Sequence, residues 1–184
     1  MTVTADQVRT VLSEADRLYT AAEVDAALDR MAAQITGTLG ERNPIVLCVM
    51  TGGLVPAGHL ITRLDFPLQL DYLHATRYRG ETSGGQLHWI TRPTFDLKDR
   101  SVLVVDDILD EGLTLGAIVS FCRQEGAREV YSAVLVDKHH DRRPEPIHAD
   151  FVGVEVGDRY VFGYGMDYKG YLRNAAGIFA VRGL

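Results

Sequence analysis

Short apolar runs that alternate with helical patterns restrict the fold of this chain more than any other feature of its sequence. Four segments have strand length and are mostly apolar: Pro44–Met50, Leu68–Ala75, Val102–Val105 and Glu129–Asp137. Continuous apolar runs of this kind are typical of parallel strands that are buried on both faces. The runs therefore predict a central, mostly parallel sheet.

Helical segments lie between these strands. Thr20 and Glu23 have the spacing of a capping box, and apolar residues then recur at helical spacing. Gly37 and Gly40 are expected to end this helix. Two further helices are predicted at 54–64 and 113–124. Alternating strands and helices indicate an α/β fold, in which ligands bind beyond the carboxyl ends of the strands.

Composition limits the classes of partner. The chain has 184 residues, of which 46% are hydrophobic and 24% charged, and this mix predicts one globular domain, 1–184. The net charge of −6 argues against nucleic acid as the main partner, because binding to its phosphates needs a basic face. Small phosphorylated ligands stay open, since metal ions and backbone N–H groups can bind them.

The compartment is predicted from two further features. No apolar run approaches the roughly 20 residues needed to span a bilayer, and the stretch MTVTADQVRT lacks the basic start and apolar core of a secretory signal. Cys48 and Cys122 lie in apolar patterns without metal-ligand spacing, which indicates buried thiols in a reducing compartment. We therefore expect a cytoplasmic protein that does not bind membranes.

A cluster of acidic residues follows the third apolar run: Asp106, Asp107, Asp110 and Glu111. Adjacent strand residues point to opposite faces, so Asp106 and Asp107 can hold different partners. From Glu111 to Thr114 the chain enters a helix, whose free N–H groups and dipole can bind a phosphate. Carboxylates beside a phosphate are useful if Mg²⁺ or ribose hydroxyls lie between them. The ordinary alternative is a solvated turn that caps the helix.

The stretch VLVVDDILDEGLTL, residues 102–115, resembles the phosphoribosyl pyrophosphate (PRPP) motif of type I phosphoribosyltransferases. Four apolar residues precede two acidic ones, and two more apolar residues precede Asp-x-Gly-x-Thr. The resemblance extends over most of the chain and is closest to the hypoxanthine-guanine phosphoribosyltransferases. GDRYVFGYGMDYKGYLRN, residues 157–174, is similar to their base-binding segment, and LVDKHHDR, residues 135–142, contains the matching lysine.

The resemblance implies a type I phosphoribosyltransferase fold, in which a mostly parallel sheet is flanked by helices. It also implies a small hood and a flexible lid loop. We expect the core at about 20–137, the hood at about 138–184 with the N-terminal segment, and the lid at about 77–88. Arg77 and Tyr78 of the lid would close over the reacting centre and exclude water.

For PRPP, the resemblance implies a role for each member of the motif. Asp106 and Asp107 would hold the ribose hydroxyls, directly or through Mg²⁺, and Asp110 would be the catalytic acid or base at N7 of the purine. The 5′-phosphate would be bound by Asp110, Glu111, Gly112, Leu113 and Thr114. Glu111 departs from the small hydroxyl residue common at its position, so its side chain must point away from the phosphate.

For the purine, the resemblance implies a pocket of three residues. Lys138 would donate to the 6-oxo group, Tyr160 would stack on the ring, and Val161 would offer backbone groups. A surface lysine and a core valine are the ordinary alternatives. His139 and His140 are expected to lie in a solvated turn.

For pyrophosphate, the resemblance implies contacts from Thr51, Gly52 and Arg173, and a second Mg²⁺ on Asp167. Arg173 in a surface ion pair is the ordinary alternative. Many relatives have lysine in place of Thr51, and this family often has a cis non-proline peptide in the same loop. In this chain the candidate for such a bond is Thr51–Gly52.

The implied reaction converts PRPP and hypoxanthine or guanine to a purine nucleoside monophosphate and pyrophosphate, with Mg²⁺ as cofactor. A homodimer or homotetramer is expected, because the family usually forms one. A phosphoribosyltransferase for xanthine or another base stays open. A PRPP-fold regulator that binds RNA is disfavoured by the acidic charge, and a nicotinamide-dependent oxidoreductase by the lack of GxGxxG after any strand.

Overall fold

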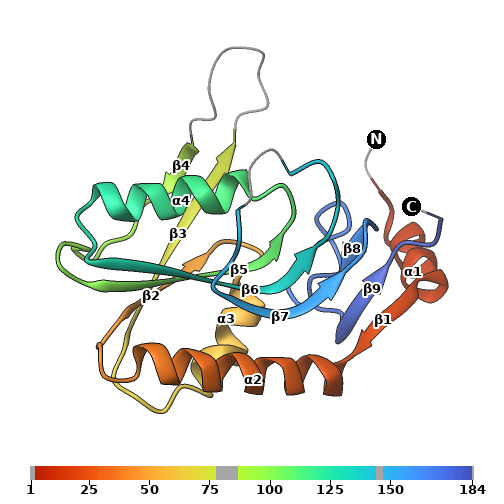
Figure 1. Ribbon diagram of the computed structural model, residues 1–184. Helices are drawn as coiled ribbons and strands as arrows, with labels where there is room; N and C mark the ends of the chain where they lie inside the picture. The colour runs from red at the N-terminus through yellow and green to blue at the C-terminus, as the bar shows by residue number, and fades with distance from the viewer. Residues whose placement is uncertain (1–2, 78–86, 144–146, 184) are drawn as a thin grey trace.

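In the computed structural model, residues 3–77, 87–143 and 147–183 are described. These residues form a six-stranded main sheet, a three-stranded second sheet and four helices (Figure 1). Most of the predicted lid, 77–88, lies outside the described residues, and so does Tyr78. Only the backbone of Arg77, at the end of a strand, is described.

The main sheet confirms the predicted α/β fold with a mostly parallel sheet. Its strands lie in the order β4-β3-β2-β5-β6-β7, and only β4 is antiparallel to its neighbour. The strands are β2 (Ile45–Val49), β3 (Gln69–Arg77), β4 (Leu87–Thr91), β5 (Ser101–Leu109), β6 (Glu129–Lys138) and β7 (Phe151–Val156). The central strand β2 is buried at all five positions, as its continuous apolar sequence requires.

Helices cover both faces of this sheet (Figure 1). Helices α2 (Ala21–Leu39) and α3 (Leu54–Ile61) pack on one face, and α4 (Leu113–Gln124) packs on the other. The capping box of Thr20 and Glu23 is formed. The first of these helices continues through Gly37 and ends before Gly40, and α3 ends three residues earlier than predicted. The predicted bounds of α4 are confirmed.

The second sheet joins the two ends of the chain. It contains β1 (Asp16–Thr20), β9 (Gly177–Ala180) and β8 (Val161–Phe162), and helix α1 (Ala5–Glu14) precedes it. Strand β9 pairs antiparallel with both of its neighbours. Residues 138–184 were predicted to form the hood, yet β7 within that range is the edge strand of the main sheet. Strand β7 pairs parallel with β6, and its Phe151, Val154 and Val156 are buried, so we restrict the term hood to residues 157–183 with β1.

The described helices also bear on membrane insertion. None of them combines enough length with enough hydrophobicity to cross a lipid bilayer.

Candidate active site

The acidic cluster begins inside β5, which continues past the apolar run predicted to form it. Asp106 pairs with Val134 of β6, and the pairing extends to Leu109. Asp106 and Asp107 are therefore strand residues and are held by the main sheet. This extension was missed because two consecutive acids look like the end of a strand in the sequence alone.

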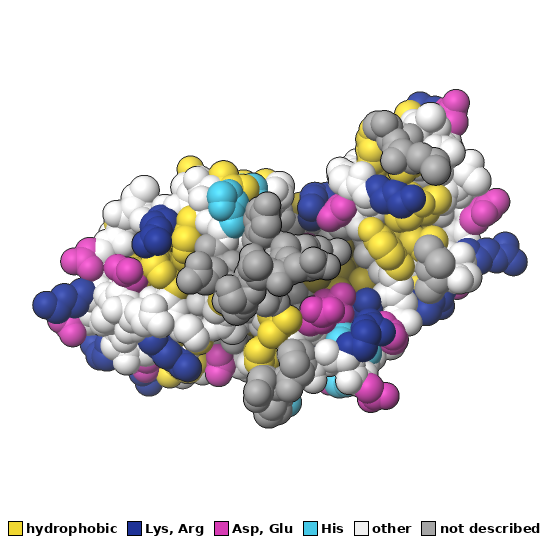
Figure 2. Space-filling model, turned by 90° about the horizontal axis from the view of Figure 1, so that it is seen from above, with side chains coloured by type: hydrophobic (Ala, Val, Ile, Leu, Met, Phe, Trp, Pro, Cys, Tyr) yellow, Lys and Arg dark blue, Asp and Glu magenta, His cyan; other side chains and the backbone are white. Residues whose placement is uncertain are grey.

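An open pocket of about 740 Å³ lies at the carboxyl ends of β2 and β5. Its walls come from four parts of the chain: residues 49–52, Ala75 of β3, the 106–115 segment, and Asp167 with Arg173 of the hood. A smaller cavity of about 240 Å³ adjoins it and shares Asp107, Asp110 and Asp167. Seen from above, a hollow separates the main body from the smaller lobe, with acidic and basic side chains at its rim (Figure 2). Nearly all predicted site residues that are described line one of these two cavities.

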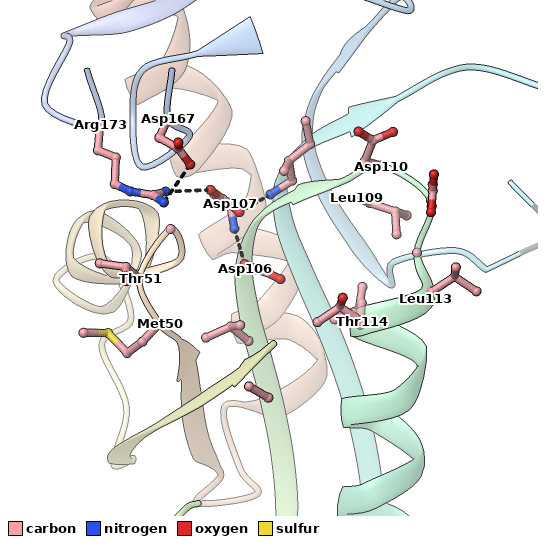
Figure 3. A pocket seen from close by; sticks show the side chains of 17 residues that line it. Met50, Thr51, Asp106, Asp107, Leu109, Asp110, Leu113, Thr114, Asp167 and Arg173 are labelled. Carbon is pink, nitrogen blue, oxygen red and sulfur yellow. Dashed lines mark hydrogen bonds and ion pairs between the residues drawn. The ribbon is translucent and has the colours of Figure 1, made fainter. Parts of the chain in front are cut away.

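Asp106 and Asp107 lie side by side in the larger pocket, between Thr51 and the start of α4 (Figure 3). Burial raises the pKa of both carboxyl groups, and in Asp106 the charge of its neighbour raises the pKa further. The backbone N–H of Asp107 donates to the Asp106 carboxylate at 2.9 Å. Two buried acids of this kind gain stability from a cation or from hydroxyl donors.

The first turn of α4 faces the same pocket, and Leu113 and Thr114 line it (Figure 3). Gly112 is the N-cap with φ of +80°, a conformation that favours glycine. A Cβ at Gly112 would also lie 3.1 Å from the Cβ of Ile147. Without a side-chain cap, the first N–H groups of the helix are available to an anion. Glu111 is exposed at the rim.

Asp110 has a partner on each carboxylate oxygen. The Nζ of Lys138 lies 3.2 Å from its Oδ2, and the Nε2 of His140 lies 2.6 Å from its Oδ1. Lys138 is also 3.6 Å from Asp158. The His140 side chain is only 1% exposed, so the prediction that it lies in a solvated turn was wrong. His139 is 58% exposed and fits that prediction.

The smaller cavity contains the three predicted purine residues. Lys138 ends β6, Val161 begins β8, and Tyr160 precedes it. Lys138 is buried with 11% of its side chain exposed, which excludes an ordinary surface lysine. Tyr160 is 40% exposed, and its ring meets that of Tyr168 edge-on at 5.7 Å. A flat exposed face beside a buried ammonium suits a planar, oxygen-bearing ligand.

The predicted pyrophosphate residues lie on the opposite wall of the larger pocket. The loop has a cis peptide bond at Met50–Thr51, one residue before the Thr51–Gly52 bond considered in the sequence. Gly52 packs directly on Asp107: a Cβ there would lie 2.0 Å from the Asp107 Oδ2. Arg173 binds Asp167 at 2.7 Å and approaches Asp107 at 3.8 Å (Figure 3). Arg173 thus joins two acids predicted to hold metal.

The acids of the pocket fit magnesium, although they do not form a complete site by themselves. No group of three or more potential ligand side chains is gathered within the described residues. Mg²⁺ is commonly bound by one or two carboxylates together with substrate phosphates and water. Asp106, Asp107 and Asp167 could therefore hold it when a phosphorylated ligand supplies the other oxygens.

Three residues of the site were missed in the sequence. His140, Asp158 and Gly165 are separated from Asp110 by 30 or more residues, and the contacts of each depend on tertiary folding. Gly165 packs on the 49–52 loop, where a Cβ would lie 2.2 Å from the Gly52 carbonyl oxygen. The one available signal for Asp158 was its place in the base-binding segment, residues 157–174, whereas His140 gave no spacing signal.

Known proteins resemble both the sequence and this arrangement. The family model described as "Phosphoribosyl transferase domain" matches residues 14–169. A hypoxanthine-guanine phosphoribosyltransferase of Bacillus subtilis is 33% identical over 83% of this chain and 84% of that protein. A hypoxanthine-guanine-xanthine phosphoribosyltransferase of Tritrichomonas foetus is 31% identical over 85% of this chain and 86% of that protein.

Solved structures agree with these relatives. A hypoxanthine phosphoribosyltransferase of Staphylococcus aureus superposes with a TM-score of 0.85 and is 27% identical, with 91% of each chain covered. The sequence, the fold and the placement of the PRPP motif at the sheet edge lead to one conclusion. This chain belongs to the phosphoribosyltransferase family.

Proposed function

We propose that this protein is a purine-salvage phosphoribosyltransferase, which converts hypoxanthine or guanine and PRPP to IMP or GMP and pyrophosphate. One observation carries the proposal: buried Lys138 lies 3.2 Å from Asp110 where the two cavities adjoin. The names and coverage of the relatives support it.

The spacing of this pair fits one edge of a 6-oxopurine. N7 and O6 lie next to each other on the same edge of guanine. The Lys138 ammonium can only donate, so it favours O6, and the Asp110 carboxylate can accept a proton or hydrogen bond from N7. The 6-amino group of adenine would place a donor against Lys138 and lose this interaction.

The larger pocket has the groups that PRPP requires. The first N–H groups of α4 and the hydroxyl of Thr114 would bind the 5′-phosphate. Asp106 and Asp107 would hold the ribose hydroxyls, and Thr51, Gly52 and Arg173 would contact pyrophosphate. Mg²⁺ held by Asp106, Asp107 and Asp167 would neutralise the pyrophosphate group.

In the reaction, a ring nitrogen of the base bonds to C1′ as the bond from C1′ to pyrophosphate breaks. Asp110 takes or returns the proton at N7, and its negative charge favours the positive charge that develops on the purine and ribose. Lys138 keeps the 6-oxo group in place while this happens. No covalent intermediate with the protein is needed.

Steady-state assays with PRPP, Mg²⁺ and a panel of bases test the proposal. We expect turnover with hypoxanthine and guanine, and at least about 100-fold lower kcat/KM with adenine. Xanthine belongs in the panel because one similar protein is named for it. Turnover with adenine or a pyrimidine alone would refute the proposal, and tight RNA binding in a filter assay without turnover would favour the regulator.

We also propose that the enzyme acts in the cytoplasm as a homodimer or homotetramer. Light scattering of the purified protein measures the assembly, and cell fractionation measures the location. A monomer at micromolar concentration would contradict the first part, and recovery of the native protein outside the cytoplasm would contradict the second.

A further inference from the structure

The side chain of His140 is buried beside the acid proposed to handle the N7 proton, and no role for it follows from the PRPP motif. Its ring lies 2.6 Å from Asp110, and 1% of the side chain is exposed. Burial of a polar ring stabilises a protein only when its nitrogens are hydrogen-bonded. Both ring nitrogens of His140 are hydrogen-bonded.

The partners of His140 define its tautomer. The backbone N–H of Arg142 donates to Nδ1 at 3.0 Å, so Nδ1 acts as the acceptor. The proton of the neutral ring is therefore on Nε2, which donates to the Oδ1 of Asp110. A histidine fixed in this way presents a single N–H in one direction.

The contact belongs to a closed cycle of polar interactions, called the polar cycle, that links Asp110, Lys138, Asp158, Arg142 and His140. The guanidinium of Arg142 binds Asp158 through two nitrogens, at 2.5 and 2.7 Å. Arg142 holds the pKa of Asp158 at about 2, so this acid stays ionised beside Lys138, 3.6 Å away. The Lys138–Asp110 contact completes the polar cycle. The cycle joins the end of β6, the following loop and the hood.

We propose that His140 is a positioning residue, which holds the Asp110 carboxylate in the orientation that meets N7 of the purine. Lys138 alone cannot do this during catalysis, because its ammonium is also needed at the 6-oxo group. With His140 on Oδ1, the carboxylate keeps one fixed donor while Lys138 moves toward the base. The inference rests on the proposed function.

Two substitutions that differ by one methylene test the inference. His140→Gln places an amide N–H near the position of Nε2, whereas His140→Asn is too short to reach Asp110. Both can still accept from Arg142. We expect His140→Asn to lower kcat with hypoxanthine on the order of 10-fold and leave the KM for PRPP unchanged. His140→Gln should stay within about twofold of the unsubstituted protein. His139→Gln is the matched control, because His139 is exposed.

A double-mutant cycle separates positioning from a structural role. In the background of Asp110→Asn, His140→Asn should cause no further loss of kcat, because the group it positions is already changed. An equal loss in both backgrounds, or equal kcat in the Asn and Gln variants, would overturn the inference. An unsubstituted protein without turnover would instead refute the proposed function, and the role of His140 would fall with it. Thermal melts of every variant identify losses that come from unfolding.

Discussion

At the scale of single residues, the site is organised around Asp110. Its carboxylate lies between two donors, Lys138 and His140, and each oxygen has one of them. Under the proposed function, we expect a carboxylate held this way to accept the N7 proton from one direction only. The chemistry of the proposed reaction therefore depends on side-chain orientation as much as on residue type.

The first prediction at this scale concerns Asp110→Asn. The amide keeps the shape of the side chain but cannot take a proton, so kcat should fall on the order of 10²-fold. PRPP affinity should change little, because the N–H groups of α4 remain. Calorimetric titration with PRPP and single-turnover assays measure the two effects. Lost PRPP binding with normal turnover at saturation would contradict the assigned role.

The second prediction concerns Lys138→Gln. Glutamine keeps one donor for O6 but loses the charge and adds an acceptor that can face an amino group. Transition-state stabilisation with hypoxanthine should fall by roughly 1.5–3 kcal/mol, the usual value of a hydrogen bond to a charged group, and this loss is measured as a lower kcat/KM. Relative tolerance of adenine should rise. An unchanged hypoxanthine-to-adenine ratio would mean that Lys138 does not read the base.

At the scale of secondary structure, one end of the main sheet carries the pocket and the other end carries a group of stabilising polar contacts. The carboxyl ends of β2 and β5 carry the pocket. At the other end, the first residue of β6, Glu129, joins β5 to the α2–β2 loop. It accepts from Ser101 at 2.9 Å and from Tyr131 at 3.0 Å, and it pairs with Arg42.

This end of the sheet predicts a dependence of stability on pH. The Arg42 guanidinium, with Ser101 and Tyr131, lowers the pKa of Glu129 from 4.5 to about 2. Because the pKa is lowered on folding, the stabilisation is complete above about pH 4.5 and is lost as the pH falls toward 2. Glu129→Gln should therefore cost roughly 1–2 kcal/mol at neutral pH and progressively less below pH 4.5.

Urea unfolding of the unsubstituted protein and of Glu129→Gln across this range measures the difference. The exposed Glu41 provides the control variant, Glu41→Gln, for loss of one negative charge on the surface. A difference between the two proteins that stayed constant down to pH 2 would show that the pairing of Glu129 is not responsible.

At the scale of the whole molecule, the hood closes on the main sheet through backbone contacts. Gly165 of the hood packs against the Gly52 carbonyl, and Arg173 donates to the carbonyl of Gly165. Gly52 in turn packs against Asp107 of β5. Three segments far apart in the sequence thus meet with no room for a Cβ between them.

We therefore predict that Gly165→Ala weakens both folding and PRPP use. The added Cβ would meet the Gly52 oxygen, and alanine is strained at a φ of +107°. We expect a loss of roughly 1–3 kcal/mol in stability and a raised KM for PRPP. Gly170→Ala is the matched control: its φ is +86°, but no atom lies within 4 Å of a Cβ there. Equal effects of the two substitutions would exclude the packing explanation.

Local features of this protein could be predicted from the order of its residues. Continuous apolar runs predicted the buried parallel strands, and the capping box of Thr20 and Glu23 predicted the start of α2. The bounds of α4 followed from its helical pattern after the glycine that precedes it. These features depend on interactions within a few residues, or on burial that every residue of a strand shares, so they are visible without the fold.

Features that depend on residues far apart in the chain could be seen only in the folded protein. The family resemblance implied that the N-terminal segment joins the hood, but no residue pattern indicated that β1 pairs with β9 or that the two-residue strand β8 completes the second sheet. The burial of His140 could not be predicted either, because a histidine pair that follows a strand has the same sequence pattern whether it is buried or lies in a solvated turn. Only folding brings Asp110 to the imidazole of His140, because the polar groups that surround this contact come from three separate segments of the chain.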